Sequence, residues 1–297
     1  CADSSAPVYP AVGVGANGFP GYSPEFSSTY ARDSFAVYLE ANVDATEDLF
    51  IQAAIRYEDY SDLGAETIYK LAAKYDITDN LGIRGSFNTG FRAPTPGQQG
   101  TTNISTRLPQ GVPVAVGLFP AGGPIAQALG AEELLPETSD GISVGFVGNI
   151  GELDFTVDYY SIDVDSLFAA ISTRTVSTDP TNASEYANFL ALDAAGVAGA
   201  NTIGGVNYFQ NGYDVNSSGV DAVVTYPMDT DLGMSFLSLT YGYNEREFES
   251  DPSAYLNAEG IYDAENFDPN TRAIVSLLHT WDDFAFLIRT SYWGESS

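Results

Sequence analysis

The sequence predicts an all-β fold, an antiparallel transmembrane β-barrel, here as an incomplete barrel segment of about ten strands with long extracellular loops. Three observations lead to this prediction. Apolar and polar residues alternate with a period of two over most of the 297 residues, as in strands with one apolar face. Short turns alternate with long segments rich in Gly, Pro and Thr. Aromatic residues, among them 19 Tyr and 17 Phe, gather near the ends of the expected strands, where amphipathic rings favour a membrane interface.

The clearest expected strand begins at Asn80 and ends at Arg92. One of its faces carries Leu81, Ile83, Phe87 and Phe91, and the other carries Arg84, Ser86, Asn88 and Arg92. The strand ends before the proline-rich segment 93–97, because proline cannot donate a hydrogen bond to a strand ladder. An apolar face toward lipid and a polar face toward a lumen are typical of a transmembrane barrel strand.

The same alternation predicts strands before and after this one. They are expected at 34–43, 49–58, 69–75, 142–146, 153–160, 217–226, 234–245, 271–281 and 284–293. Three long connections separate some of them, at 93–138, about 167–215 and about 246–270. The Ala-rich stretch 183–200 is expected to hold a short helix, and residues 1–33 are expected to form an irregular loop. Because a soluble sandwich has no reason to keep its long loops at one end, the loop pattern favours the barrel.

Cationic and amide side chains gather on the polar faces of the first strands. We expect these residues to face the lumen and a plug inside it: Arg56, Lys70, Lys74, Arg84, Asn88 and Arg92. An ordinary solvated face would account for the charges equally well, and the alternation of loops decides between the two interpretations.

Composition excludes several classes of function. The formal net charge is −29, from 40 acidic and 11 basic side chains, which argues against nucleic acid as a partner. The apolar runs are shorter than the roughly 18 residues that a membrane-spanning helix needs. Cys1 is the single cysteine, so a disulfide framework or a thiolate metal site cannot form; Cys1 is either a remnant of truncation or a lipid-modified N-terminus.

No catalytic site and no cofactor are expected. His279 is the single histidine and shares a face with apolar residues near Trp281, so we place it at the membrane interface rather than in a triad. Acidic residues at 163–165 and 245–249 could bind a hard cation such as calcium. The sequence lacks the calcium-binding loop with a glycine at its bend, so we interpret these residues as solvated acidic faces. Spacing alone leaves paired carboxylates for glycoside hydrolysis open.

Several short motifs resemble those of TonB-dependent outer-membrane receptors. The strand that ends in Gly90-Phe91-Arg92-Ala93-Pro94 is similar to the family's signature strand. The strand at 54–62 resembles the strand that lies one hairpin before that signature in the same family. Pro136-Glu137-Thr138 and Gly219-Val220-Asp221 are similar to later strand starts, so the resemblance covers about 30–294.

This resemblance implies a barrel of about 22 strands around an N-terminal plug. Residues 34–294 would be a partial barrel from the C-terminal half, with the plug domain and the terminal strands absent. The implied function is active import of a scarce, bulky ligand, such as a siderophore, cobalamin or an oligosaccharide, across the outer membrane of a Gram-negative cell. Membrane lipid, the receptor's own plug and the TonB energising complex would be its partners.

Ligand contacts are expected in the long loops, where amide donors and aromatic rings suit a sugar or a polar chelate. The candidates are Gln98, Gln99, Thr101, Thr102, Asn103, Tyr208, Gln210, Asn211 and Tyr213. Acidic loops favour neutral sugars or peptides over anionic siderophores. Two other functions stay open at this point: a passive porin or structural barrel, and a soluble β-rich carbohydrate-binding module.

Overall fold

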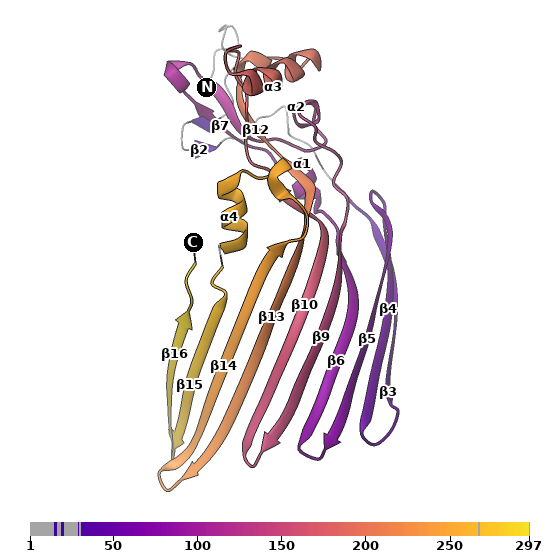
Figure 1. Ribbon diagram of the computed structural model, residues 1–297, viewed down its shortest axis with the longest axis vertical. Helices are drawn as coiled ribbons and strands as arrows, with labels where there is room; N and C mark the ends of the chain where they lie inside the picture. The colour runs from indigo at the N-terminus through magenta and orange to yellow at the C-terminus, as the bar shows by residue number, and fades with distance from the viewer. Residues whose placement is uncertain (1–14, 17–18, 21–28, 30, 267, 297) are drawn as a thin grey trace.

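The computed structural model describes residues 15–16, 19–20, 29, 31–266 and 268–296. Its main feature is an open antiparallel sheet of ten strands in which neighbours in sequence are neighbours in space (Figure 1). The strands are β3 (Ser34–Asp44), β4 (Leu49–Tyr60), β5 (Gly64–Thr78), β6 (Leu81–Arg92), β9 (Glu137–Ile150), β10 (Leu153–Ala170), β13 (Phe209–Thr230), β14 (Gly233–Phe248), β15 (Thr271–Trp281) and β16 (Phe284–Trp293). The predicted fold class is confirmed, and the sheet remains an unclosed segment with β3 and β16 at its edges.

The connections are sorted by length between the two ends of the sheet. Tight turns at 45–48, 79–80, 151–152, 231–232 and 282–283 lie at the lower end in Figure 1. The three long connections, 93–136, 171–208 and 249–270, all lie at the upper end, together with the short β4–β5 turn at 61–63. This sorting is the arrangement that a transmembrane barrel requires.

Burial in the sheet is inverted relative to a soluble protein. On the apolar face, Leu39 is 70% exposed and Leu71 is 56% exposed. On the polar face, Gln52, Arg56 and Glu58 are partly buried. No second layer of the described chain covers the apolar face, and the polar face is the more shielded one, as on the concave side of a curved sheet. The two faces therefore suit lipid outside and a lumen inside.

The long connections 93–136 and 171–208 fold together into one unit, which we call the cap. Its centre is a sheet in the order β11 (Arg174–Thr175), β12 (Ile203–Asn207), β8 (Val114–Leu118), β7 (Asn103–Arg107). The parallel pairing of β12 with β8 joins the two connections directly. The helices α1 (Pro96–Gly100), α2 (Pro124–Ala128) and α3 (Ala183–Ala194), with the short η3 (Pro109–Gly111) and η4 (Ala200–Thr202), complete it.

The cap has a hydrophobic core of its own. Ala126, Leu192 and Val206 are fully buried there, with Ile104 and Phe119 at 2% exposure. A smaller cluster of Ala121, Leu134 and Phe168 lies where the cap meets the top of the sheet. The helix expected within 183–200 is confirmed as α3. The cap sheet is a difference from the sequence prediction, because short strands far apart in sequence pair within segments that were expected to be loops.

The remaining connection contains η5 (Pro252–Ala254) and α4 (Ala258–Asn266), which lies beside the upper end of β14 (Figure 1).

Strands β9 and β13 begin at Glu137 and Phe209, earlier than the alternation predicts. Above the membrane both faces of a strand meet protein or water, so the apolar–polar period that marks a strand is lost there. Cys1 and most of the loop expected at 1–33 lie outside the described residues. Within that range β1 (Gly15–Ala16) pairs with β2 (Phe19–Pro20).

No helix in the described part of the chain is long and apolar enough to span a bilayer.

Candidate functional site

The six residues predicted to face a lumen lie on one face of the sheet. Arg56 pairs in register with Ile68, Lys70 with Asn88, and Lys74 with Arg84, and residues two apart on a strand share a face. Arg92 continues the same series on β6, opposite Glu137 of β9. Contact with a plug stays a prediction for all six.

Most of these cations are neutralised on the same face. Lys74 Nζ lies 2.7 Å from Asp76 Oδ1, and Arg56 pairs with Glu58 on its own strand. Arg84 Nε donates to Asp158 Oδ1 at 2.7 Å, reaching from β6 across β9 to β10. The residue between them is Gly145, whose missing side chain leaves the space in which this pair forms. The face is therefore polar and charge-balanced rather than strongly cationic.

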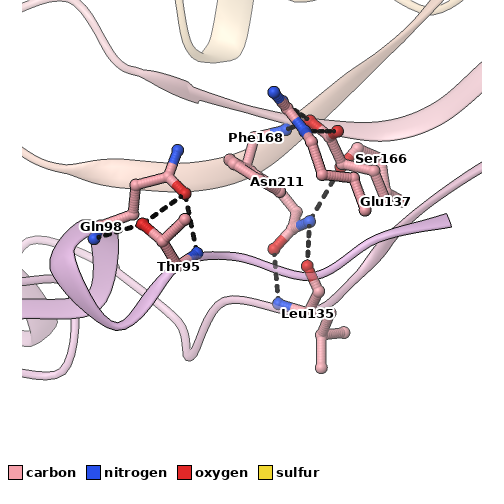
Figure 2. A network of polar contacts seen from close by, with 8 residues as sticks. Thr95, Gln98, Leu135, Glu137, Ser166, Phe168 and Asn211 are labelled. Atoms are coloured by element: carbon pink, nitrogen blue, oxygen red, sulfur yellow. Dashed lines mark hydrogen bonds and ion pairs between the residues drawn. The ribbon is translucent and has the colours of Figure 1, made fainter. Parts of the chain in front are cut away.

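A network of polar contacts, which we call the neck, joins the top of the sheet to the cap (Figure 2). Glu137, 4% exposed, accepts hydrogen bonds from Arg92 Nη2 and from the backbone N–H of Phe168, both at 2.7 Å. The Arg92 guanidinium also lies over the Phe168 ring, 4.3 Å from its centroid. A buried carboxylate needs such charge-assisted partners, so this pair ties β6, β9 and β10 together.

Asn211 forms the second half of the neck. Its Oδ1 accepts from the Leu135 N–H at 2.8 Å, and its Nδ2 donates to the carbonyls of Leu135 at 2.9 Å and Ser166 at 2.8 Å. Ser166 has φ of 56°, a left-handed conformation that costs free energy in a residue with a side chain, and it lies in a β-bulge. Asn211 and Asp214, whose Oδ1 accepts from the Ser166 N–H, hold this bulge in place.

The predicted ligand contacts do not form one surface. Gln98 is engaged in a capping box with Thr95 at the start of α1, where Thr95 N–H donates to its Oε1 at 2.8 Å. Gln99 is partly buried, Thr102 is 8% exposed, and Thr101 and Asn103 are exposed. For each of these residues, binding of a ligand stays a prediction.

Of the candidates at 208–213, the two tyrosines are buried, and Gln210 and Asn211 are partly buried. Tyr208 is fully buried in the cap core and donates its hydroxyl to the Leu129 carbonyl at 2.9 Å; burial raises the pKa of this phenol. Tyr213 is 5% exposed and packs edge-on against Phe248, with ring centroids 4.8 Å apart. Gln210 Oε1 is buried and has no hydrogen-bond partner among the described residues.

Sequence reasoning missed a cleft of about 780 Å³ at the upper end of the sheet, between α4 and strands β10, β13 and β14. Its floor comes from the polar face of the sheet: Val164, Val215, Ser217, Asn244 and Arg246. The opposite wall comes from α4 and the segment after it: Asp263, Ala264, Glu265, Asn266, Asp268 and Asn270. The signal that could have revealed it is the charged run Asn244–Glu247, just before a long connection.

The cleft floor is well ordered by hydrogen bonds. Asn244 Nδ2 donates to the hydroxyls of Tyr160 and Ser217, both at 2.9 Å. Arg246 forms no ion pair with any residue that the structure describes, although it lies opposite Ser217 on the neighbouring strand. The arrangement offers amide and hydroxyl groups, one guanidinium and several carboxylates to a molecule on the lumen side of the sheet.

Within the described residues, no group of three or more His, Cys, Asp or Glu side chains is arranged to hold a metal ion. His279 lies on the apolar face near the tight turn at 282–283, and its Nδ1 is 2.7 Å from the hydroxyl of Ser235. This position agrees with the interfacial placement expected from the sequence.

Comparison with known proteins gives consistent results. The profile of the family described as TonB dependent receptor-like, beta-barrel, matches residues 3–296. A vitamin B12 transporter, BtuB of Photobacterium profundum, is 34% identical over 64 residues, which are 22% of this chain and 10% of that protein.

Solved structures share the fold. The siderophore receptor PirA of Acinetobacter baumannii superposes with a TM-score of 0.59 at 13% identity, over 97% of this chain and 38% of that one. A mutant of the ferric enterobactin receptor PfeA of Pseudomonas aeruginosa, in complex with enterobactin, gives 0.62 at 14% identity, over 90% and 34%. The chain thus spans well under half the length of these proteins.

The match of the family profile over nearly the whole chain confirms the resemblance seen in the short motifs, and with it the expected outer-membrane location. The chain belongs to the TonB-dependent receptor-like β-barrel family of Gram-negative outer-membrane proteins.

Proposed function

We propose that the protein to which this chain belongs imports a scarce, bulky ligand across the outer membrane, driven by the TonB complex through a plug domain. The observation that carries the proposal is the inverted burial of the sheet. Its apolar face is exposed while its polar face is shielded, so the sheet separates lipid from a polar passage.

The cap and the cleft add support on the extracellular side. A folded cap with its own core stands above the sheet, and a cleft of about 780 Å³ opens on the lumen side near it. A receptor that captures dilute ligand before transport needs preformed polar surfaces at this level. The relatives include receptors for siderophores and a vitamin B12 transporter, which agrees with a bulky ligand.

Energised uptake is the property to measure. Cells with the full-length gene and cells lacking it would be given ferric siderophores, cobalamin and oligosaccharides in labelled form, with and without a functional TonB complex. We expect uptake of one ligand class to need both the gene and the complex. Uptake that persists without the complex would instead support a passive porin, and extraction of the full-length protein into buffer without detergent would support a soluble carbohydrate-binding module.

A further inference from the structure

The cleft beneath α4 is acidic, although it holds one cation. Three carboxylates line its wall, those of Asp263, Glu265 and Asp268, and the guanidinium of Arg246 lies on its floor. Glu245 and Glu247 alternate with the floor residues on β14, so their side chains point to the other face of the sheet. At neutral pH the three wall carboxylates and the guanidinium carry a formal charge of −3 + 1, or −2. The positive charge of Arg246 has no ion-pair partner among the described residues, but the negatively charged carboxylates around it are more numerous.

These charges act together on any molecule inside the cleft. A volume of about 780 Å³ is only about 10 Å across, which is comparable with the Debye length at 0.1 M salt. A bound ligand would thus lie within reach of every charge in the lining. A ligand with several negative charges would be repelled, whereas a neutral or positively charged ligand would not.

The uncharged part of the lining suits a polar ligand. Ser217, Asn244, Asn266 and Asn270 supply hydroxyl and amide groups that can donate and accept hydrogen bonds. Val164 and Val215 give the floor an apolar patch. Hydroxyl, carbonyl and amide groups on a compact ligand could satisfy this combination without carrying net negative charge.

We propose that the cleft between α4 and strands β13 and β14 binds a polar ligand whose net charge is zero or positive, and that it discriminates against polyanionic ligands. The inference rests on the proposed function, because it takes the cleft to be on the ligand's route. It specifies the charge class of the ligand and assigns the discrimination to the carboxylates of α4 and the segment after it.

The test compares two ferric complexes of similar size and different charge, a neutral tris-hydroxamate and a trianionic tris-catecholate. Their binding to the purified full-length receptor in detergent would be measured by fluorescence quenching, in metal-depleted buffer at low and high salt. The wild-type receptor is expected to favour the neutral complex. The variant Asp263→Asn/Glu265→Gln/Asp268→Asn is expected to bind the trianion about tenfold more tightly at low salt, with little change for the neutral complex.

A matched control removes the same charges elsewhere. Asp79→Asn/Glu152→Gln/Asp231→Asn alters two aspartates and one glutamate in the tight turns at the opposite end of the sheet. It changes the net charge equally, and it is expected to leave both affinities within about twofold. The 16 residues of β14 extend over roughly 50 Å, so the turns lie farther from the cleft than a Debye length even at 0.01 M salt. Circular dichroism and thermal unfolding would establish that all variants are folded.

Three outcomes would overturn the proposal: a trianion bound by the wild-type receptor as tightly as the neutral complex, an equal gain in the control variant, or no binding of either complex by the wild-type receptor and the cleft variant. Since binding in detergent needs no energy source, these outcomes are independent of the uptake experiment. A receptor with the expected charge preference but without TonB-dependent uptake would refute the proposed function and keep the cleft assignment.

Discussion

The sheet and the cap use apolar residues in opposite ways. In the sheet, Leu71 and Ile142 are more than half exposed on the apolar face, and in the cap Leu192 and Val206 are fully buried. The sheet is stable only where lipid replaces water on that face, whereas the cap buries its own core as a soluble domain does. One chain is thus adapted to two solvents, with the neck as the boundary between them.

A second difference concerns connectivity. Strands of the sheet pair with their neighbours in sequence, but the cap joins two connections through the parallel β8–β12 pairing, with Val206 opposite Gly117. Because both connections contribute to one core, we expect 93–136 and 171–208 to move as a single body. Substitutions in each region can show whether the two are separate in energy as well as in structure.

The largest effect is expected in the cap core. Leu192→Ala removes a fully buried side chain of α3 and should destabilise the cap by about 2–5 kcal/mol, because the cavity cannot fully collapse. Hydrogen exchange of the full-length receptor in detergent would show faster exchange over 183–207 and no change over 142–160. The control is Leu190→Ala on the same helix, where the side chain is 46% exposed and the expected effect is below about 0.5 kcal/mol. Equal effects of the two variants would refute the assigned core.

The next effect tests which solvent each face of the sheet meets. Leu71→Arg places a charge on the apolar face near the middle of β5 and should destabilise the inserted receptor by about 2–4 kcal/mol. Ala54→Arg places the same charge on the polar face, between Glu40 of β3 and Lys70 of β5. Attraction to the first and repulsion by the second largely offset each other, so this variant should have little effect. Unfolding of the full-length receptor in lipid bilayers would be monitored by gel mobility. If Ala54→Arg proved the more harmful, the assignment of the faces would be reversed.

A smaller effect is expected within the polar face. A Cβ added to Gly145 would overlap Asp158 Oδ1 and lie 2.7 Å from the Val157 carbonyl oxygen, so Gly145→Ala must displace the partner of Arg84. We expect a loss of about 1–3 kcal/mol in the same unfolding measurement. In an Asp158→Ala background the loss should shrink, since one of the two overlaps is gone. If Gly145→Ala cost the same free energy of unfolding in that background, making room for the Arg84–Asp158 ion pair would not be the reason for a glycine at position 145.

The two regions also differ in how far the sequence predicts them. The strands of the sheet were predictable because lipid on one face imposes a period of two, as in Leu81, Ile83 and Phe87. The cap strands have two to five residues, and the pairing of Ile203 with Ala115 joins positions far apart in the chain. No local pattern encodes such a contact. Tyr208 shows the same limit for the site, since a tyrosine suits both a ligand and a core until its neighbours are known.

The smallest effect tests the boundary between the regions at α1. Thr95 Oγ1 accepts from the Gln98 N–H at 3.2 Å while Gln98 Oε1 accepts from the Thr95 N–H, so the two side chains close a capping box just after β6. Thr95→Ala should loosen α1 by about 1 kcal/mol, and Thr95→Ser, which keeps the hydroxyl, should not. Hydrogen exchange would report this over 96–100 alone. If exchange instead rose throughout 183–207, the neck would transmit local changes into the cap core, and the two regions would not be energetically separate.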